Sequence, residues 1–241
     1  MEKYKWGLSI DIEGFSNQYE HNEKLKSKAI WALHNLMEAI INIGTNVYPG
    51  KSENNFSERL FVHQFGDGFV ITSDFYEKNP ERCIAISIAL LRHMLMKGVA
   101  VKAAISTGDM SDIKGCYPPV VKNANNSRVN LGMGLMTIIP VMGTALTKSY
   151  KLLNCKSGNI LIIDSRRFEI QPNIILNEIS EGISTIDWIS SDLALAKEIS
   201  SKANLEYGSN IDLLKIFEAY IQQEPAPPTK WVNSTKSTWQ N

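Results

Sequence analysis

The strongest constraint on the fold is a pair of short motifs that each place an aspartate and a glycine at the end of an apolar strand pattern. The first is Asp11-Ile12-Glu13-Gly14-Phe15-Ser16, and the second is Phe65-Gly66-Asp67-Gly68. Glycine lets the chain turn sharply beside each aspartate, because it adopts positive φ without a Cβ penalty. Two carboxylates on neighbouring strands can hold divalent metal ions. A sheet that brings Asp11 and Asp67 together would therefore carry a metal site.

The elements around these motifs follow a definite order. Apolar alternation predicts strands over residues 4–12, 58–65, 69–73 and 99–107, and helical periodicity predicts helices over 23–44 and 80–97. The second and third strands would form a hairpin through Gly66-Asp67-Gly68. This β-α-β-β-α-β order is that of the split βαβ, or ferredoxin-like, arrangement, in which the first strand lies beside the hairpin. We therefore expect Asp11 and Asp67 to converge in an α+β fold with an antiparallel sheet.

The rest of the chain is less regular. We predict a strand around residues 116–121, a helix over 144–153, a strand over 159–164, and helices over 191–203 and 210–222. This pattern divides the chain into a main domain over 1–165, a mainly helical extension over 166–223 and a tail over 224–241. Three prolines open that tail, so we expect it to be loosely ordered.

Composition excludes several classes of protein. A chain of 241 residues suits one large domain, or one domain with an extension. Its 25 basic and 25 acidic residues give no net charge, which argues against broad binding to nucleic acid or to an anionic membrane. No apolar run is long enough for a membrane span, and the start shows no signal-type segment. Three widely separated cysteines indicate free thiols, so we expect a cytoplasmic protein.

The segment after the first aspartate suggests an anion site. Gly14 lets the backbone approach a phosphate, and exposed amides at the start of the following helix would favour negative charge. Gly14 and Phe15 are therefore candidate substrate-binding residues. The alternative is an ordinary turn in which Ser16 or Asn17 caps the helix. Each aspartate could likewise serve only to cap a turn.

Taken together, the motifs resemble those of class III nucleotidyl cyclases. Residues 11–16 match the first metal motif of that family, D-I-x-G-F-[ST], and residues 65–67 match its second, a hydrophobic residue followed by Gly-Asp. The segment 143–152 is similar to the family's helix signature, G-x-x-V-N-x-A-x-R-[LM]. The strand 103–108 resembles the family's next strand. The resemblance covers roughly residues 4–165 and implies a class III cyclase catalytic domain.

The resemblance also implies a reaction. Asp11 and Asp67, with the carbonyl of Ile12, would hold two divalent cations, Mg²⁺ or Mn²⁺, and the ribose 3′-OH would attack the α-phosphorus with release of pyrophosphate. Thr147 and Lys151 stand where the family has the Asn and Arg that stabilise the transition state. Because lysine keeps the charge but loses the bidentate fork of arginine, a second cation, Arg128, is also a candidate for binding the α-phosphate.

Base recognition departs from the adenylate cyclase pattern. His63 and Pro140 occupy the places of the lysine and the acidic residue that read adenine, and they cannot reproduce that donor–acceptor pair. With an enlarged stretch over 109–142, the chain resembles the pyrimidine cyclases of bacterial Pycsar anti-phage systems. Such enzymes make cyclic UMP or cyclic CMP, which activates a partner effector. We expect His63 and Lys102, on adjacent strands, to contact the base, and Lys102 favours UTP over CTP because it can donate to a carbonyl edge.

Class III sites form between two chains, so the resemblance implies that the protein is a head-to-tail homodimer. Its small-molecule partner would be UTP or CTP. Several alternatives stay open: a cytidylate cyclase, a purine cyclase with atypical base contacts, and a degenerate domain that binds a nucleotide as a sensor. A diguanylate cyclase has a similar topology, but its hairpin reads Gly-Gly-Asp/Glu-Glu-Phe. Gly68 directly after Asp67 does not match that hairpin.

Overall fold

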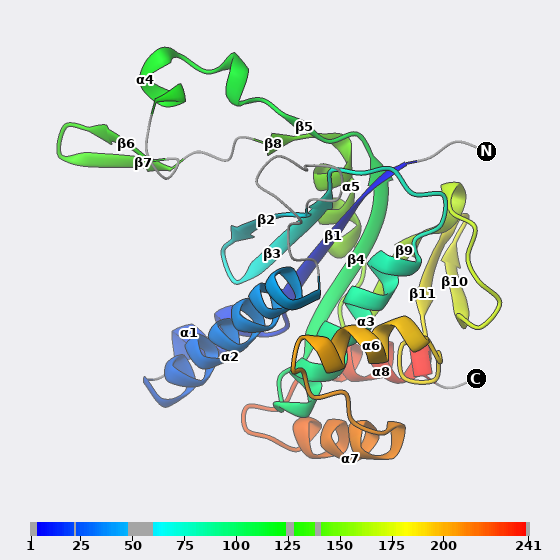
Figure 1. Ribbon diagram of the computed structural model, residues 1–241. Coiled ribbons are helices and arrows are strands. Elements are labelled where there is room, and N and C mark those ends of the chain that lie inside the picture. The colour runs from blue at the N-terminus through cyan, green and yellow to red at the C-terminus, as the bar shows by residue number, and fades with distance from the viewer. Residues whose placement is uncertain (1–3, 22, 48–59, 124–127, 138–140, 240–241) are drawn as a thin grey trace.

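The computed structural model describes all residues except 1–3, 22, 48–59, 124–127, 138–140 and 240–241 (Figure 1). Its centre is a seven-stranded sheet with the order β10-β11-β9-β4-β1-β3-β2. The strands are β1 (Lys5–Ile12), β2 (Leu60–Phe65), β3 (Gly68–Ser73), β4 (Val101–Gly108), β9 (Leu161–Asp164), β10 (Leu176–Ser180) and β11 (Ile183–Ile186).

Four of these strands form the predicted ferredoxin-like core. β1 lies between β3 and β4 and is antiparallel to both, while β2 pairs with β3 at the edge. The two crossovers are the helices α2 (Glu23–Asn42) and α3 (Glu81–Met96). The α+β fold class is thereby confirmed. Beyond β4, the sheet continues through β9, which runs parallel to β4.

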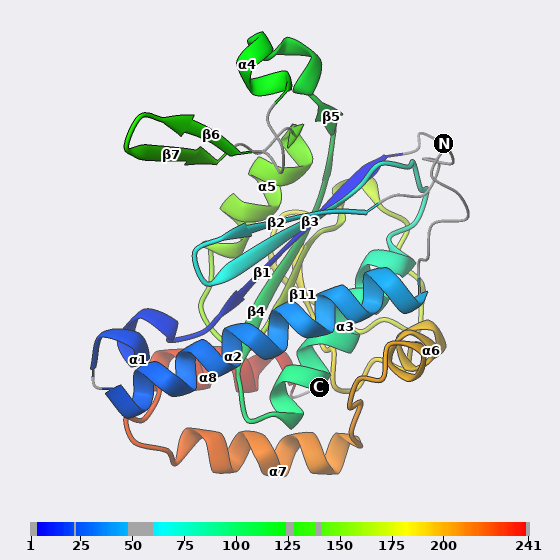
Figure 2. The same cartoon turned by 60° about the vertical axis from the view of Figure 1, so that its left-hand side comes forward.

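Alternation along β1 separates the two faces of the sheet. Trp6, Leu8 and Ile10 are fully buried in the core cluster that α2 and α3 share. The other face, which carries Ser9 and Asp11, is covered by α5 (Thr144–Leu153), whose bounds agree with the predicted helix. Figure 2 shows α5 on one side of the sheet and α2 with α3 on the other.

One predicted strand is wrong. Residues 116–121 contain the end of a 3-10 turn, Lys114–Cys116, and most of the short helix α4 (Pro119–Lys122). Pro118 and Pro119 explain the difference, because proline cannot donate to a strand ladder but fits the first turn of a helix. The neighbouring strands are β5 (Ser111–Asp112), β6 (Arg128–Leu131), β7 (Gly134–Thr137) and β8 (Val141–Met142). The β6–β7 hairpin projects from the body of the molecule (Figures 1 and 2).

The C-terminal region contains the predicted helices as α6 (Ala194–Lys202) and α7 (Asn210–Ile221), but β10 and β11 also extend the central sheet through it. The domain boundary at residue 165 stays a sequence prediction. Within the part of the chain that the structure describes, no helix combines the length and apolar character that a membrane span needs.

The expectation of a loosely ordered tail is wrong for α8 (Thr229–Trp239). Trp231 is only 5% exposed and stacks on Phe217 with ring centroids 5.9 Å apart. Trp239 meets the same Phe217 ring edge-on at 4.6 Å. These aromatic contacts bury large apolar areas, and this burial holds the segment on the fold although prolines precede it.

Candidate functional site

The two aspartates converge as expected. Asp11, in the second-to-last position of β1, lies opposite Gly68 of β3, and Asp67 lies in the turn between β2 and β3. Phe65 pairs directly with Gly68, so the turn has two central residues, one fewer than the sequence suggested. Asp11 and Asp67 both line a small cavity of ≈ 80 Å³.

The raised pKa of Asp11 also reflects the closeness of Asp67. Burial, followed by the negative charge of Asp67, raises the pKa of Asp11 from 3.8 to about 6, while Lys102 opposes the shift. An increase with this cause means that the ionised carboxylates repel each other across a partly desolvated space. Positive charge placed between them would relieve that repulsion.

Gly68 is required for the close approach of the hairpin to Asp11. A Cβ atom at this position would lie 2.9 Å from Asp11 Oδ1 and 2.7 Å from the carbonyl oxygen of Ile10. A side chain at residue 68 would therefore displace the Asp11 carboxylate or the backbone beneath it.

The donor set fits divalent cations that a substrate helps to bind. Among the described residues, no group of three His, Cys, Asp or Glu side chains could hold a metal ion alone. Mg²⁺ commonly takes only one or two carboxylates and completes its shell with phosphate oxygens and water. Asp11 and Asp67 supply such a pair. Ile12, the proposed carbonyl ligand, is the last residue of β1, and its side chain is buried on the core face.

Lys102 lies beside the aspartates but is held by another acid. It pairs with Asp11 across β1 and β4, and its Nζ lies 3.3 Å from Oε1 of Glu13. The expectation that Lys102 and His63 sit on adjacent strands is wrong, because β1 and β3 separate β4 from β2. The two side chains therefore cannot contact one base edge as neighbours.

His63 lies on the edge strand β2, opposite Val70. Since paired residues project from the same side of a sheet, His63 shares the face of Ser9 and Asp11. Burial lowers the pKa of His63, and its Nε2 has no hydrogen-bond partner among the described residues. Buried polar atoms normally have a hydrogen-bond partner, so this ring nitrogen is unusual on the sheet face that carries Asp11.

Thr147 and Lys151 are exposed on α5, and neither lines the aspartate cavity. The α5 side chains that do line it are Tyr150 and Leu153, followed by Asn154 just beyond the helix. Sequence reasoning missed Tyr150 and Asn154. Their separation of four positions, which places both on one face of a helix, was the signal that could have identified them.

The remaining predicted site residues are dispersed. Gly14 has φ +76° and an open Cβ position, and Phe15 begins α1 (Phe15–His21) with its ring stacked on Tyr19. Arg128 is exposed on the projecting β6–β7 hairpin. Pro140 lies outside the described residues. The structure therefore brings together the metal-motif residues and Lys102, whereas Thr147, Lys151 and Arg128 do not line the cavity where Asp11 and Asp67 meet.

No family model matches the chain, and no curated protein matches it. Among solved structures it is similar to a non-canonical dimeric guanylyl cyclase domain of the RhoGC fusion protein from the aquatic fungus Blastocladiella emersonii. That match has a TM-score of 0.42 and 8% identity, and covers 76% of this chain and 92% of the other. A monomeric crystal structure of a double mutant of the same domain gives a TM-score of 0.46 at 8% identity, covering 76% and 93%. With identities and scores of this size, the likeness says nothing about substrate or activity.

Proposed function

We propose that this protein is a nucleotidyl cyclase that forms a 3′,5′-cyclic nucleotide and pyrophosphate from a nucleoside triphosphate. The observation that carries the proposal is the convergence of Asp11 and Asp67 on one cavity, where burial and mutual repulsion raise the pKa of Asp11. Asp11, Asp67 and the Ile12 carbonyl would hold Mg²⁺ or Mn²⁺, which when bound supplies positive charge for the triphosphate and the developing oxyanion. The chain's own contribution is to hold these oxygens in a fixed arrangement.

The proposed catalytic unit is a head-to-tail homodimer. Thr147 and Lys151, the proposed transition-state residues, are exposed on α5 and do not line the cavity of their own chain. A second copy could present the same two side chains to Asp11 and Asp67. Two-fold symmetry would then give two equivalent sites. Arg128, on the projecting hairpin, is the alternative cation that a partner could supply.

The proposed substrate is UTP, with CTP as the alternative, and the product would activate an anti-phage effector. His63 supports a polar contact to the base, because its Nε2 is buried and unpaired among the described residues. Lys102 gives no support for uridine, because its ammonium group is held by Glu13. A purine cyclase and a nucleotide sensor without turnover are the competing functions.

The test is to incubate the purified protein with ATP, GTP, CTP and UTP in turn, with Mn²⁺, and to identify products by mass spectrometry. We expect cyclic UMP and pyrophosphate, and no turnover by Asp11→Asn or Asp67→Asn. Asp192→Asn, which changes an exposed aspartate on the C-terminal region, is the control and should remain active. Cyclic AMP as the sole product would contradict the pyrimidine assignment. Binding of a triphosphate without pyrophosphate release would favour the sensor.

A further inference from the structure

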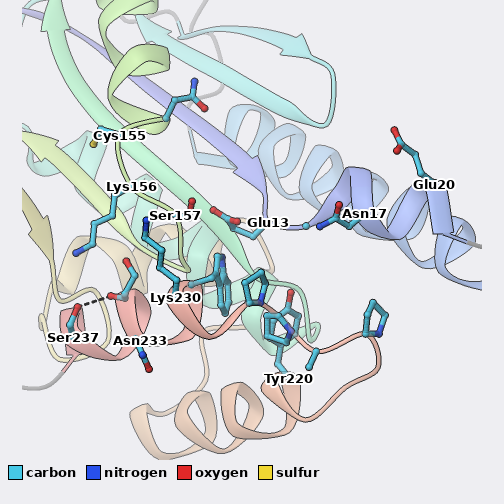
Figure 3. Close-up of a pocket in the computed structure, with 18 residues that line it drawn as sticks. Glu13, Asn17, Glu20, Cys155, Lys156, Ser157, Tyr220, Lys230, Asn233 and Ser237 are labelled. Atoms are coloured by element: carbon cyan, nitrogen blue, oxygen red, sulfur yellow. Dashed lines mark hydrogen bonds between the residues drawn. The ribbon is translucent and has the colours of Figure 1, made fainter.

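A second and much larger cavity, of ≈ 1040 Å³, lies between the first aspartate motif and the C-terminal segment. Three parts of the chain form its walls: the β1–α1 turn with Glu13 and Gly14, the α5–β9 turn with Lys156 and Ser157, and the segment from Tyr220 to Ser237. Figure 3 shows Lys230 extending from α8 toward the turn that carries Ser157. The volume is at the upper end of that of small-molecule sites.

This cavity adjoins the aspartate site. Asn154 lines both cavities, and Glu13 and Gly14 follow Asp11 within three positions of the chain. A ligand group held in the large cavity would thus lie next to the place where Asp11 and Asp67 meet.

The walls offer mainly hydrogen-bond donors and positive charge. Lys156 and Lys230 make no ion pair or side-chain hydrogen bond with any described residue. The charge of Glu13 is already matched, because its Oε1 lies 3.3 Å from Lys102 Nζ and accepts from the Gly158 amide at 3.3 Å. Glu20 is the other acid in the wall and is exposed on α1. The structure therefore leaves two lysines against one unmatched carboxylate.

Two aromatic side chains also line the cavity. The indole of Trp231 is 5% exposed, and its Nε1 is buried and not presented to the cavity, so Trp231 contributes an apolar surface to the wall. Burial, with the nearby charge of Glu13, raises the pKa of Tyr220 to about 12, so its hydroxyl stays protonated. Amide and hydroxyl side chains complete the wall at Asn17, Asn233, Ser157, Ser234 and Ser237.

We infer that this cavity binds a polyphosphate group, with Lys156 and Lys230 as its charged ligands and α8 as its wall. Phosphate oxygens match a donor-rich, cationic site, because hydrogen bonds to charged groups are the stronger ones. The assignment of that group to the β- and γ-phosphates of the substrate rests on the proposed function. A separate phosphorylated ligand has the same chemistry. In either case, the C-terminal region contributes residues to a binding site.

The test uses inorganic tripolyphosphate as the probe, measured by calorimetry on the full chain at low salt without divalent metal. We expect saturable binding by the wild type. The affinity should fall on the order of tenfold in the single variant Lys156→Ala, and by a similar factor in the single variant Lys230→Ala. The matched control is Lys236→Ala, since Lys236 is exposed on the same helix and does not line the cavity. Equal affinity of all three variants and the wild type, or no saturable binding, would overturn the inference.

A second measurement uses Cys155, which is exposed and lines the cavity. In a Cys116→Ser background, the one exposed thiol left is Cys155, because Cys83 is buried. Tripolyphosphate should slow the reaction of Cys155 with a thiol reagent. An unchanged rate at saturating tripolyphosphate would contradict occupancy of this cavity.

Competition distinguishes the two sources of the polyphosphate. If UTP and tripolyphosphate exclude each other in the metal-free protein, the cavity takes the phosphates of the nucleotide. If both bind at once, it takes a separate ligand. Lysine-dependent binding in a protein that turns over no triphosphate would leave this inference intact and remove the proposed function, so the two can fail independently.

Discussion

The hydroxyl groups of Ser9 in β1 and Ser149 in α5 are hydrogen bonded at 2.9 Å, although 140 positions separate them in the sequence. Both residues are buried, so this bond fixes α5 on the strand that carries Asp11. Gly7, two residues before Ser9 and on the same face of β1, packs against the backbone of Ala145 in α5. The seating of this helix determines that Tyr150 and Asn154 line the aspartate cavity.

Gly7→Ala should disturb this seating. The added Cβ would lie 2.3 Å from the carbonyl oxygen of Ala145, which is backbone and cannot move without moving α5. We expect a loss of about 1–3 kcal/mol in the free energy of unfolding, measured by urea denaturation, because overpacking of a core costs this much. Gly115→Ala is the control, since nothing lies within 4 Å of its Cβ position. Wild-type stability of Gly7→Ala would contradict this packing.

The stability of the metal-free protein should depend on the ionisation of Asp11. Its folded-state pKa of about 6 lies above the ordinary value of 3.8, so the protonated carboxyl is the form that stabilises the fold. The protonated carboxyl contributes on the order of 3 kcal/mol to the free energy of unfolding. This stabilisation is fully present below about pH 4 and is lost as pH rises through about 6. Asp11→Asn, which is neutral throughout, should lack this loss.

The measurement is urea denaturation of both proteins in EDTA from pH 4 to pH 7. The difference in free energy of unfolding between Asp11→Asn and the wild type isolates Asp11, because the other titrating groups are common to both. We expect the free energy of unfolding of Asp11→Asn to increase relative to that of the wild type as pH rises. A difference that is constant with pH would show that Asp11 is not buried beside Asp67 as described.

Arg92 in α3 forms hydrogen bonds with residues of the C-terminal region. Its guanidinium is buried and donates to the carbonyl of Ile189 at 2.6 Å and to Asn210 Oδ1 at 2.7 Å, and it lies 4.3 Å over the ring of Tyr207. Arg92→Leu would leave these acceptors without their donor, so we expect a loss of about 3 kcal/mol or more in the free energy of unfolding. Arg92→Lys should also destabilise, because an ammonium group cannot reproduce the planar fork.

Lys202→Ala is the control for Arg92. Lys202 pairs with Glu198 at the surface, where both side chains are about half exposed and such salt bridges contribute little, so its replacement should leave stability nearly unchanged. The measurements are circular dichroism and urea denaturation of the three variants. An Arg92→Leu protein as stable as Lys202→Ala would mean that the C-terminal region is held by its apolar contacts alone.

The sequence contained enough information for the core fold, because the ferredoxin-like order follows from local patterns. The strands β1 to β4 and the helices α2 and α3 lie where local patterns predict them, and the tight Gly66-Asp67 turn fixes the hairpin, whereas α1 was not predicted. Once that order is known, the meeting of Asp11 and Asp67 follows from strand adjacency. The same order separates His63 from Lys102, because β1 and β3 lie between their strands.

What the sequence did not indicate depends on long-range contacts. The ion pair of Glu13 with Lys102 and the packing of Trp231 on Phe217 join positions far apart in the chain, and no local pattern encodes them. Prolines at 225, 227 and 228 suggested disorder, but the aromatic side chains after them find partners in α7. Local composition predicts how a segment behaves alone, whereas α8 is ordered by burial against the rest of the fold.

Shared sites between two chains can be tested by mixing inactive variants. Asp67→Ala removes a metal-side residue and Lys151→Ala removes a residue that is exposed on α5, away from the aspartate cavity. If sites form head to tail, half of the dimers in an equal mixture are mixed, and each has one intact site of two. We therefore expect about a quarter of the wild-type rate of pyrophosphate release. The control mixes Asp67→Ala with Asp11→Ala: both changes lie on the same side of the site, so neither site of a mixed dimer is intact and no activity should return. Activity in neither mixture would contradict the shared site, because a mixed dimer would then contain no intact site.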